Sequence, residues 1–154
     1  MAMQATETHV LFPSSGTPSA QLEGLLGSPG DGVRHPAAVL CHPGNRGQTG
    51  MEYPVIAACC RALQQIGFVT LRFNFRGVQG SGGSRSSGLH EARDIHGALR
   101  FLRERADVDP SRLYLVGNSF GAQMVLEAAR EDEQVAGMVC IVLPLALLPA
   151  EPDY

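Results

Sequence analysis

The sequence predicts an α/β fold, specifically a three-layer αβα sandwich built around one mainly parallel sheet. Short apolar runs, typical of strands buried on both faces, alternate with longer segments whose apolar residues recur at helical spacing. No repeat or linker interrupts this alternation, and a length of 154 residues suits a single domain. We therefore expect one domain over residues 1–154, with helices covering both faces of the sheet.

Two strands open the chain, at residues 8–12 and 21–26, and the proline, serine and glycine residues between them predict a turn. Residues 37–41 are apolar throughout and predict a third strand. Apolar residues from Met51 to Ile66 recur at helical spacing, so a helix is expected there. The remaining elements are a strand at 68–73, a helix at 89–106, a turn at 109–111, a strand at 113–116, a helix at 120–130 and a strand at 135–143.

Composition excludes several functional classes. The net charge is −3 and the arginines are scattered, so no nucleic-acid surface is expected. All 12 basic residues are arginine, which excludes a P-loop lysine and a Schiff-base lysine. The apolar stretch at 135–150 is too short for a membrane span and contains prolines, and the N-terminus has no signal-peptide features. The 4 cysteines lack metal-ligand spacing, so we expect free thiols and a cytoplasmic protein. From the short apolar stretch we expect no membrane partner.

The fifth predicted strand runs directly into Gly-x-Ser-x-Gly at residues 117–121, with Asn118 before the serine, and a helix follows at once. This arrangement is typical of a nucleophile elbow, a turn that exposes a serine at the top of a sheet. Gly117 and Gly121 fit the turn, because a β-carbon at either position would strike a neighbouring element. Ser119 would lie at a helix N-terminus, where developing negative charge is favoured. The alternative is an ordinary turn in which this serine is only a helix N-cap.

Two further motifs follow predicted strands. Cys-His-Pro-Gly-Asn occupies residues 41–45, after the third strand, and Leu-Arg-Phe-Asn-Phe-Arg-Gly occupies residues 71–77, after the fourth. With the motif at 117–121, three consecutive strand ends match, and on these residues the chain resembles the α/β-hydrolase superfamily, in its dienelactone-hydrolase-like branch of predicted serine hydrolases. The resemblance extends over about residues 35–145. It implies six strands in the spatial order 1-2-4-3-5-6.

The resemblance implies acyl transfer to the Ser119 hydroxyl followed by attack of water. An oxyanion hole needs two backbone N–H groups, and Phe120 would supply one. The other should come from the loop after the third strand. Because Pro43 has no N–H, we expect Asn45 to donate, with Gly44 as the next candidate. Substrates would be small esters, thioesters or lactones, and no cofactor or metal ion is expected.

His42 and Arg76 are candidate accessory residues. The resemblance implies that His42 lies beneath the oxyanion loop and shapes it, whereas the alternative makes it a general base. Arg72 and Arg76 flank the end of the fourth strand. Such arginines can bind an acidic substrate group bidentately, but more often they hold loops by pairing with carboxylates.

All 5 histidines precede Ser119, so the family's chain order of serine, acid and histidine cannot be completed here. In the family, two more strand–helix units of roughly 30 residues each carry the acid and the histidine. We therefore expect a truncated serine hydrolase whose sheet is incomplete at its C-terminal side. Two alternatives stay open: a non-catalytic hydrolase-like binding or interaction module, and a hydrolase whose base comes from a partner chain or from His42.

The last predicted strand, at 135–143, is apolar at almost every position, which is typical of a strand with neighbours on both sides. No further strand is expected to pair with its outer edge, and only Pro144 at its end opposes unwanted pairing. Besides a small ester-type substrate, we therefore expect one partner, a second copy of the chain bound through the sixth strand.

Overall fold

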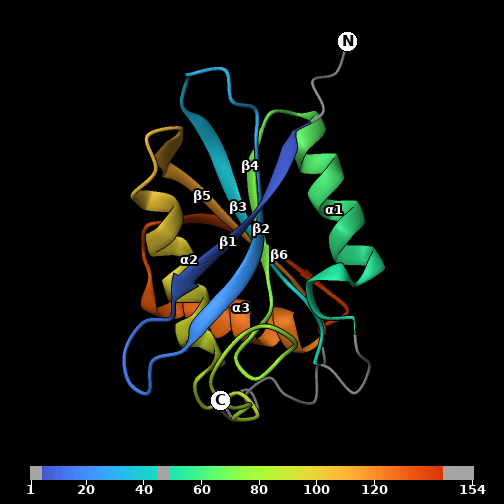
Figure 1. Ribbon diagram of the computed structural model, residues 1–154, viewed down its shortest axis with the longest axis vertical. Coiled ribbons are helices and arrows are strands. Elements are labelled where there is room, and N and C mark those ends of the chain that lie inside the picture. The colour runs from blue at the N-terminus through green and yellow to red at the C-terminus, as the bar shows by residue number, and fades with distance from the viewer. Residues whose placement is uncertain (1–4, 45–48, 144–154) are drawn as a thin grey trace, which may run out of the picture.

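The computed structural model describes residues 5–44 and 49–143, which form one sheet flanked by helices (Figure 1). The strands are β1 Thr6–Pro13, β2 Gln21–Ser28, β3 His35–Cys41, β4 Val69–Phe73, β5 Val108–Asn118 and β6 Val135–Ile141. The helices are the short 3₁₀ helix η1 Gly50–Glu52 and the α-helices α1 Pro54–Gln65, α2 Glu91–Arg103 and α3 Phe120–Glu131.

The strands lie in the order β1-β2-β4-β3-β5-β6, which confirms the predicted order and the α/β class. β1 and β2 are antiparallel to their neighbours, whereas β4, β3, β5 and β6 run parallel. Because β3 lies between β4 and β5, the carboxyl ends of these three strands are adjacent. The three sequence motifs that follow them are thereby brought to one edge of the sheet.

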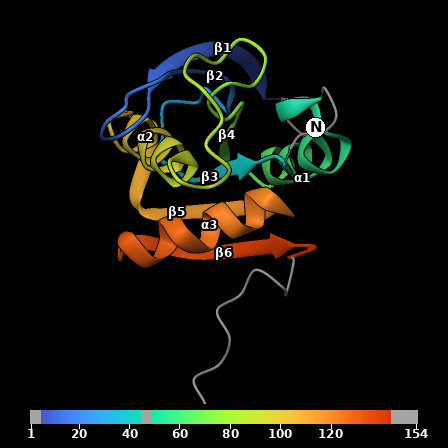
Figure 2. The same cartoon turned by 90° about the horizontal axis from the view of Figure 1, so that it is seen from below.

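Helices cover both faces of the sheet, as predicted (Figure 2). Successive residues of β3 point to opposite faces, as in any strand. Val39 packs in the larger core cluster, which contains residues of α2 and α3. Ala38 and Leu40 pack on the other face, in a smaller cluster with Ile56 of α1. The sandwich therefore has α1 on one side and α2 with α3 on the other.

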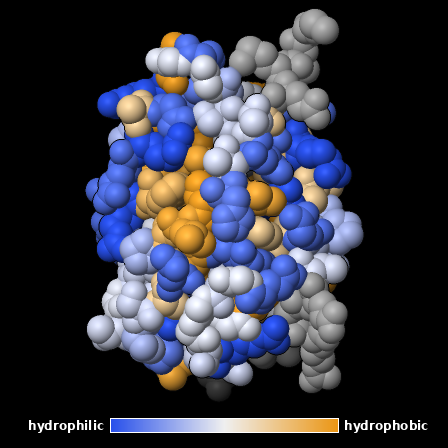
Figure 3. Space-filling model, in the orientation of Figure 1, coloured by the Kyte–Doolittle hydropathy of each residue, from blue (hydrophilic) through white to orange (hydrophobic). Residues whose placement is uncertain are grey.

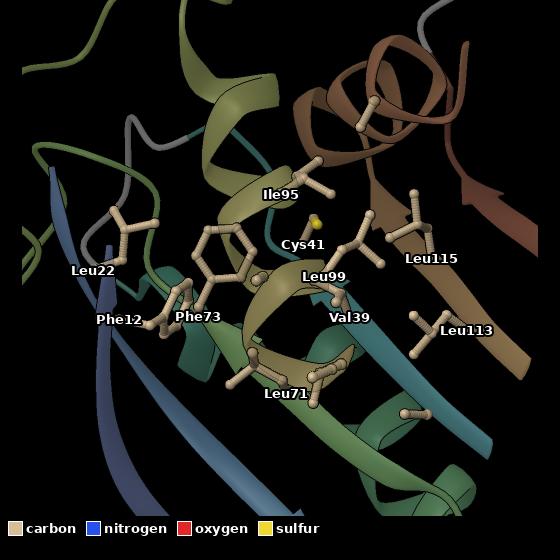
Figure 4. Packing of buried hydrophobic residues seen from close by; sticks show 14 of the residues in the cluster. Phe12, Leu22, Val39, Cys41, Leu71, Phe73, Ile95, Leu99, Leu113 and Leu115 are labelled. Carbon is tan, nitrogen blue, oxygen red and sulfur yellow. The ribbon is translucent and has the colours of Figure 1, made fainter. Parts of the chain in front are cut away.

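The larger core cluster is closed by α2. Figure 4 shows Ile95 and Leu99 of this helix among side chains from β1, β3, β4 and β5. Both are fully buried, and each such side chain contributes roughly 1.5–3 kcal/mol on leaving water. Every residue of β4 is buried, as expected for a central strand. This packing fixes the sheet edge that carries the motifs.

Two predicted boundaries were wrong for local reasons. The helix expected from residue 51 begins at Pro54, which occupies its first turn, and η1 precedes it. Residues 109–111 lie within β5 rather than in a turn before it. A hydrogen bond typical of turns is nevertheless present there, because Asp109 Oδ1 accepts from Ser111 N at 3.0 Å. The pairing of β5 with β3 shifts register at this point.

The outer strand β6 keeps apolar side chains in contact with solvent. Met138 is 47% exposed and Val139 is 55% exposed, so within the described residues this apolar strand is not covered on both faces. Pro144 lies outside the described residues. The opposite edge of the sheet presents β1, and Figure 3 shows an apolar area near the centre of that side, bordered by hydrophilic residues.

We expect the chain to self-associate through β6. Within residues 5–44 and 49–143, no strand pairs with the outer edge of β6, and an exposed apolar edge is a template for pairing with another strand. Size-exclusion chromatography with light scattering at micromolar concentration should give a mass above that of the monomer. Replacing Val139 with lysine, a residue that blunts strand edges, should shift the protein toward monomer. A stable monomer of the unaltered chain would contradict this expectation.

Candidate active site

The turn between β5 and α3 has the geometry of a nucleophile elbow. Ser119 has φ 52° and ψ −115°, a left-handed conformation that is unfavourable for residues with a β-carbon. Its side chain makes no capping hydrogen bond to α3, so the N-cap alternative finds no support. The Ser119 N–H donates to Ile141 O at 2.8 Å, which fastens the turn to the end of β6. The preceding residue, Asn118, is buried at the end of β5.

Both glycines of the motif are required by close backbone contacts. A β-carbon on Gly117 would lie 2.6 Å from Ala122 N, inside the elbow itself. A β-carbon on Gly121 would overlap the Cys41 carbonyl oxygen and lie 2.6 Å from the carbonyl oxygen of His42. The start of α3 is therefore pressed directly against the end of β3.

The loop after β3 reaches the elbow. A β-carbon on Gly44 would lie only 2.8 Å from Cβ of Phe120, so the backbone at position 44 passes against the residue that follows Ser119. Asn45, the preferred second oxyanion donor, lies outside the described residues. Gly44, the other candidate, lies beside Phe120, the residue expected to supply the first N–H.

His42 is held as a neutral structural residue. The Phe75 N–H donates to His42 Nε2 at 3.2 Å, and His42 Nδ1 lies 2.7 Å from the carbonyl oxygen of Pro43. Since a carbonyl can only accept, Nδ1 must carry the proton and Nε2 must be the acceptor. Burial, with a further contribution from the Arg85 charge, lowers the pKa of His42 to about 4. Neither ring nitrogen is left to take a proton from Ser119, so the contacts support the loop-shaping role.

The guanidinium group of Arg76 also hydrogen-bonds to other groups of the protein. Its Nε and Nη2 donate to Asp94 Oδ1 at 3.0 and 2.7 Å, and its backbone N–H donates to Asp94 Oδ2 at 2.9 Å. Both side chains are buried in this ion pair. Arg72 similarly pairs with Glu7 and Glu52. These contacts support the loop-holding role for both arginines, although Arg76 still lines the cavity described below.

The loop that follows β4 is anchored by two more carboxylates. Glu23 of β2 accepts hydrogen bonds from Asn74 Nδ2 at 2.7 Å and from Gly80 N at 2.8 Å. Glu91, in the first turn of α2, accepts from Ser86 N at 2.7 Å and from Gly88 N at 2.9 Å. Burial alone would raise the pKa of Glu91, but these hydrogen bonds outweigh it and lower that pKa. The loop is thereby fixed beside the elbow, at the lower end of Figure 1.

Ser119 opens onto a cavity of about 730 Å³, a size typical of small-molecule sites. Phe75 contributes an apolar wall, with its ring centroid 5.0 Å from His42 and 5.6 Å from Phe120. The residues that line the cavity are His42, Gly44, Phe75, Arg76, Val78, Arg85, Ser87, Glu91, Ser119, Phe120 and Gln123.

Sequence reasoning missed the polar lining residues Arg85, Ser87, Glu91 and Gln123, and it assigned no site role to the apolar Phe75 and Val78. The first two belong to a glycine- and serine-rich loop whose path no periodicity encodes. Gln123 lies one helical turn after Ser119, and its N–H donates to Ser119 O at 3.1 Å, so spacing along α3 could have identified it.

Within the described residues, no group of three or more histidine, cysteine or acidic side chains is arranged to hold a metal ion. In the same part of the chain, no helix is both long enough and apolar enough to cross a membrane.

The buried neutral His42 predicts a pH-dependent stability. Between its ordinary pKa of 6.5 and about 4, the unfolded chain binds a proton that the folded chain does not. The free energy of unfolding should therefore fall by about 2–3 kcal/mol between pH 7 and pH 4.5. Urea unfolding across this range tests it. Glu7, Glu23 and Glu91 have lowered pKa values and lose their contributions mainly below pH 4.5, whereas burial raises the pKa of Asp94, whose protonation in the folded chain opposes the fall.

The control for this prediction is His42→Gln, because a glutamine amide can hydrogen-bond but does not titrate. Its stability should be lower at pH 7 and should change less between pH 7 and pH 4.5. Equal pH dependence in both proteins would assign the effect to other groups.

Comparisons with protein-family models and with curated proteins give partial matches. A family model described as alpha/beta hydrolase fold matches residues 37–153. An uncharacterized 31.7 kDa protein of Escherichia coli is 30% identical over 120 residues, which are 77% of this chain and 40% of that protein. An uncharacterized protein of Rickettsia prowazekii is 31% identical over 110 residues, which are 71% of this chain and 46% of that protein. The chain thus spans less than half the length of these relatives.

Solved structures match more of the chain. A serine hydrolase without lid from Xanthomonas campestris has a TM-score of 0.76 and 29% identity, covering 92% of this chain and 64% of that one. An alpha-beta serine hydrolase homologue from Coxiella burnetii has a TM-score of 0.76 and 27% identity, covering 96% of this chain and 67% of that one.

Proposed function

Because this chain belongs to the alpha/beta hydrolase fold family, we propose that Ser119 is the nucleophile of a serine hydrolase acting on small esters, thioesters or lactones. The observation that carries the proposal is the strained backbone of Ser119, with φ 52°, in the lining of a cavity that Gly44 and Phe120 also line. Strained residues persist where the surrounding structure holds them, and they cluster at active sites. The cavity volume of about 730 Å³ supports a small substrate.

In the proposed reaction, Ser119 Oγ attacks the ester carbonyl carbon and its proton passes to a base. The negative charge that develops on the carbonyl oxygen is stabilised by the N–H of Phe120 and by a second N–H from the loop after β3, at Gly44 or Asn45. Collapse of the tetrahedral intermediate expels the alcohol or thiol, which takes up the proton, and leaves an acyl group on Ser119. Water then attacks this acyl group and releases the acid.

The described residues that line the cavity include no group placed to take the proton from Ser119 Oγ. Among the described residues, His42 is the only histidine that lines the cavity, and both of its ring nitrogens are engaged. This engagement favours a second candidate function, a non-catalytic module that binds small molecules in the same cavity. It also predicts slow turnover by the isolated chain if Ser119 is the nucleophile.

The test uses p-nitrophenyl acetate with the purified chain and with Ser119→Ala. We expect slow release of p-nitrophenol that requires Ser119, together with an acetyl group on the peptide that contains Ser119, detected by mass spectrometry. Hydrolases that lack a triad member still retain about 10³–10⁴-fold catalysis over water, from binding and the oxyanion hole. Added imidazole, as a mobile base, should accelerate the Ser119-dependent part.

The control is Ser84→Ala, which removes an exposed serine hydroxyl that does not line the cavity. It should behave like the unaltered chain. Equal rates and no acetyl adduct in the unaltered and Ser119→Ala proteins would favour the binding module instead.

A further inference from the structure

The polar side chains that line the cavity fall into two groups. His42, Arg76 and Glu91 direct their hydrogen bonds to the protein itself, as described above. Ser87 and Gln123 differ: across the described residues, neither side chain has a hydrogen-bond partner, although both line the cavity with Ser119. These two neutral groups are therefore available to a bound molecule.

Ser87 is presented to the cavity in a strained conformation. Its φ is 53°, and the next residue, Gly88, has φ 98°. The left-handed region suits glycine, whereas serine has a β-carbon that makes it unfavourable there. A serine hydroxyl is thus held at the cavity where a glycine would be more stable. Such an outlier, observed in the cavity that a candidate nucleophile also lines, points to a functional role.

The segment around Ser87 is fixed on both sides. Glu91 accepts hydrogen bonds from the N–H groups of Ser86 and Gly88, and also from Ser86 Oγ at 2.6 Å. Gly88 packs against α3, since a β-carbon there would lie 3.3 Å from Cε of Met124. The strained backbone at Ser87 is therefore held in place by its neighbours rather than free to relax.

We propose that Ser87, assisted by Gln123, is a specificity-determining residue that hydrogen-bonds a neutral oxygen of the substrate. This rests on the proposed function of Ser119, because it concerns the same cavity. Hydroxyl and amide groups are uncharged donors and acceptors, so they match an ether or hydroxyl oxygen. Phe75, Val78 and Phe120 give the cavity apolar surface for the alkyl portion. The preferred substrate is then a short ester that carries an additional neutral oxygen.

Equilibrium binding of stable amides tests the proposal without requiring turnover. One pair varies the acyl side: the p-nitroanilides of methoxyacetic acid and of butyric acid. The other varies the leaving-group side: N-(2-methoxyethyl)acetamide and N-butylacetamide. Within each pair an ether oxygen replaces a methylene group. In NMR titrations of the full chain, the ether member of at least one pair should bind more tightly, by roughly two- to tenfold, as expected for one net hydrogen bond.

Ser87→Ala should abolish this preference while Ser84→Ala, the exposed serine in the same loop, should leave it intact. Ser87→Gly should abolish it too and should raise the thermal unfolding midpoint, because glycine relieves the left-handed strain. A merely structural Ser87 would leave the ether preference unchanged in both variants. Absence of any preference, or a preference that survives Ser87→Ala, would overturn the proposal.

A third probe separates the neutral group from the Arg85 charge, which lines the same cavity. The mono-p-nitroanilide of succinic acid carries a carboxylate instead of an ether. The proposal would be wrong if the succinic acid probe bound more tightly than both ether probes in the unaltered chain and no more tightly than them in Arg85→Gln. That result would show that the subsite recognises a negative charge. Because binding is measured separately from hydrolysis, failure of Ser119 as a nucleophile would be seen in the ester assay alone.

Discussion

Replacing Arg76 with methionine is expected to lower the free energy of unfolding by about 3–5 kcal/mol. The Asp94 side chain is 0% exposed and the Arg76 side chain 2% exposed, so the carboxylate would be left in the core without its cation. Methionine keeps much of the side-chain volume, which limits the effect of a cavity. Urea unfolding at pH 7, with the slope of the transition compared between proteins, measures the loss.

Two further variants separate the buried charge from other effects. Arg112→Met breaks an ion pair with Asp109 at the surface, where Arg112 is 48% exposed, and should cost less than about 1 kcal/mol. Arg76→Met combined with Asp94→Leu removes both charges and should recover part of the loss. Recovery should be incomplete, because Asp94 Oδ2 also accepts the backbone N–H of Arg76. If the single Arg76 variant costs no more than the Arg112 variant, the pair does not act as a buried ion pair.

This pair illustrates what the sequence could and could not predict. Arg76 was identified from its motif after the fourth strand, and its two candidate roles were stated. Its partner was not identified, because Asp94 lies 18 positions away in the first turn of α2, where an acidic residue is ordinarily explained by the helix dipole. Glu91 was missed for the same reason. In both cases the carboxylate serves the loop after β4 rather than the helix end.

The architecture was more predictable than these contacts. The continuous apolar run at β3 indicated a central strand, and the elbow glycines indicated where β5 gives way to α3. The strand order places the carboxyl ends of β4, β3 and β5 together, and His42, Arg76 and Ser119 line one cavity there. Hydrophobic periodicity records which side chains are buried, and burial largely determines a layered sheet.

The cavity residues that the sequence did not predict are positioned by individual hydrogen bonds rather than by hydrophobic patterning. Ser87 belongs to a loop whose path depends on individual hydrogen bonds to Glu23 and Glu91, contributed by elements on either side of it in the sequence. Periodicity and propensity carry no information about such bonds, which become visible only when the chain is folded. At β6 the sequence was informative, since no further strand was expected beyond it, and it lies at the edge of the sheet with Met138 and Val139 exposed.

Gly121→Ala is expected to reverse the usual effect of this substitution. In a helix, alanine is favoured over glycine by about 1 kcal/mol, and Gly121 lies in the first turn of α3. Here the added β-carbon would overlap the Cys41 carbonyl oxygen and lie 2.6 Å from the His42 carbonyl oxygen, so α3 and β3 would have to separate. We expect a loss of about 3 kcal/mol or more, at the upper end of overpacking effects. Thermal and urea unfolding measure it.

The matched control is Gly82→Ala, in the loop after β4. Its β-carbon would lie 3.4 Å from the Gln21 carbonyl oxygen, an ordinary contact, so stability should change by less than about 1 kcal/mol. In any folded fraction of the Gly121 variant, the carbonyls of Cys41 and His42 would be displaced from the elbow. The loop at Gly44 would then move away from Phe120, and Ser119-dependent acetylation should fall further than stability alone explains. A Gly121→Ala protein as stable as the Gly82 variant would show that α3 does not press on β3 as the backbone contacts require.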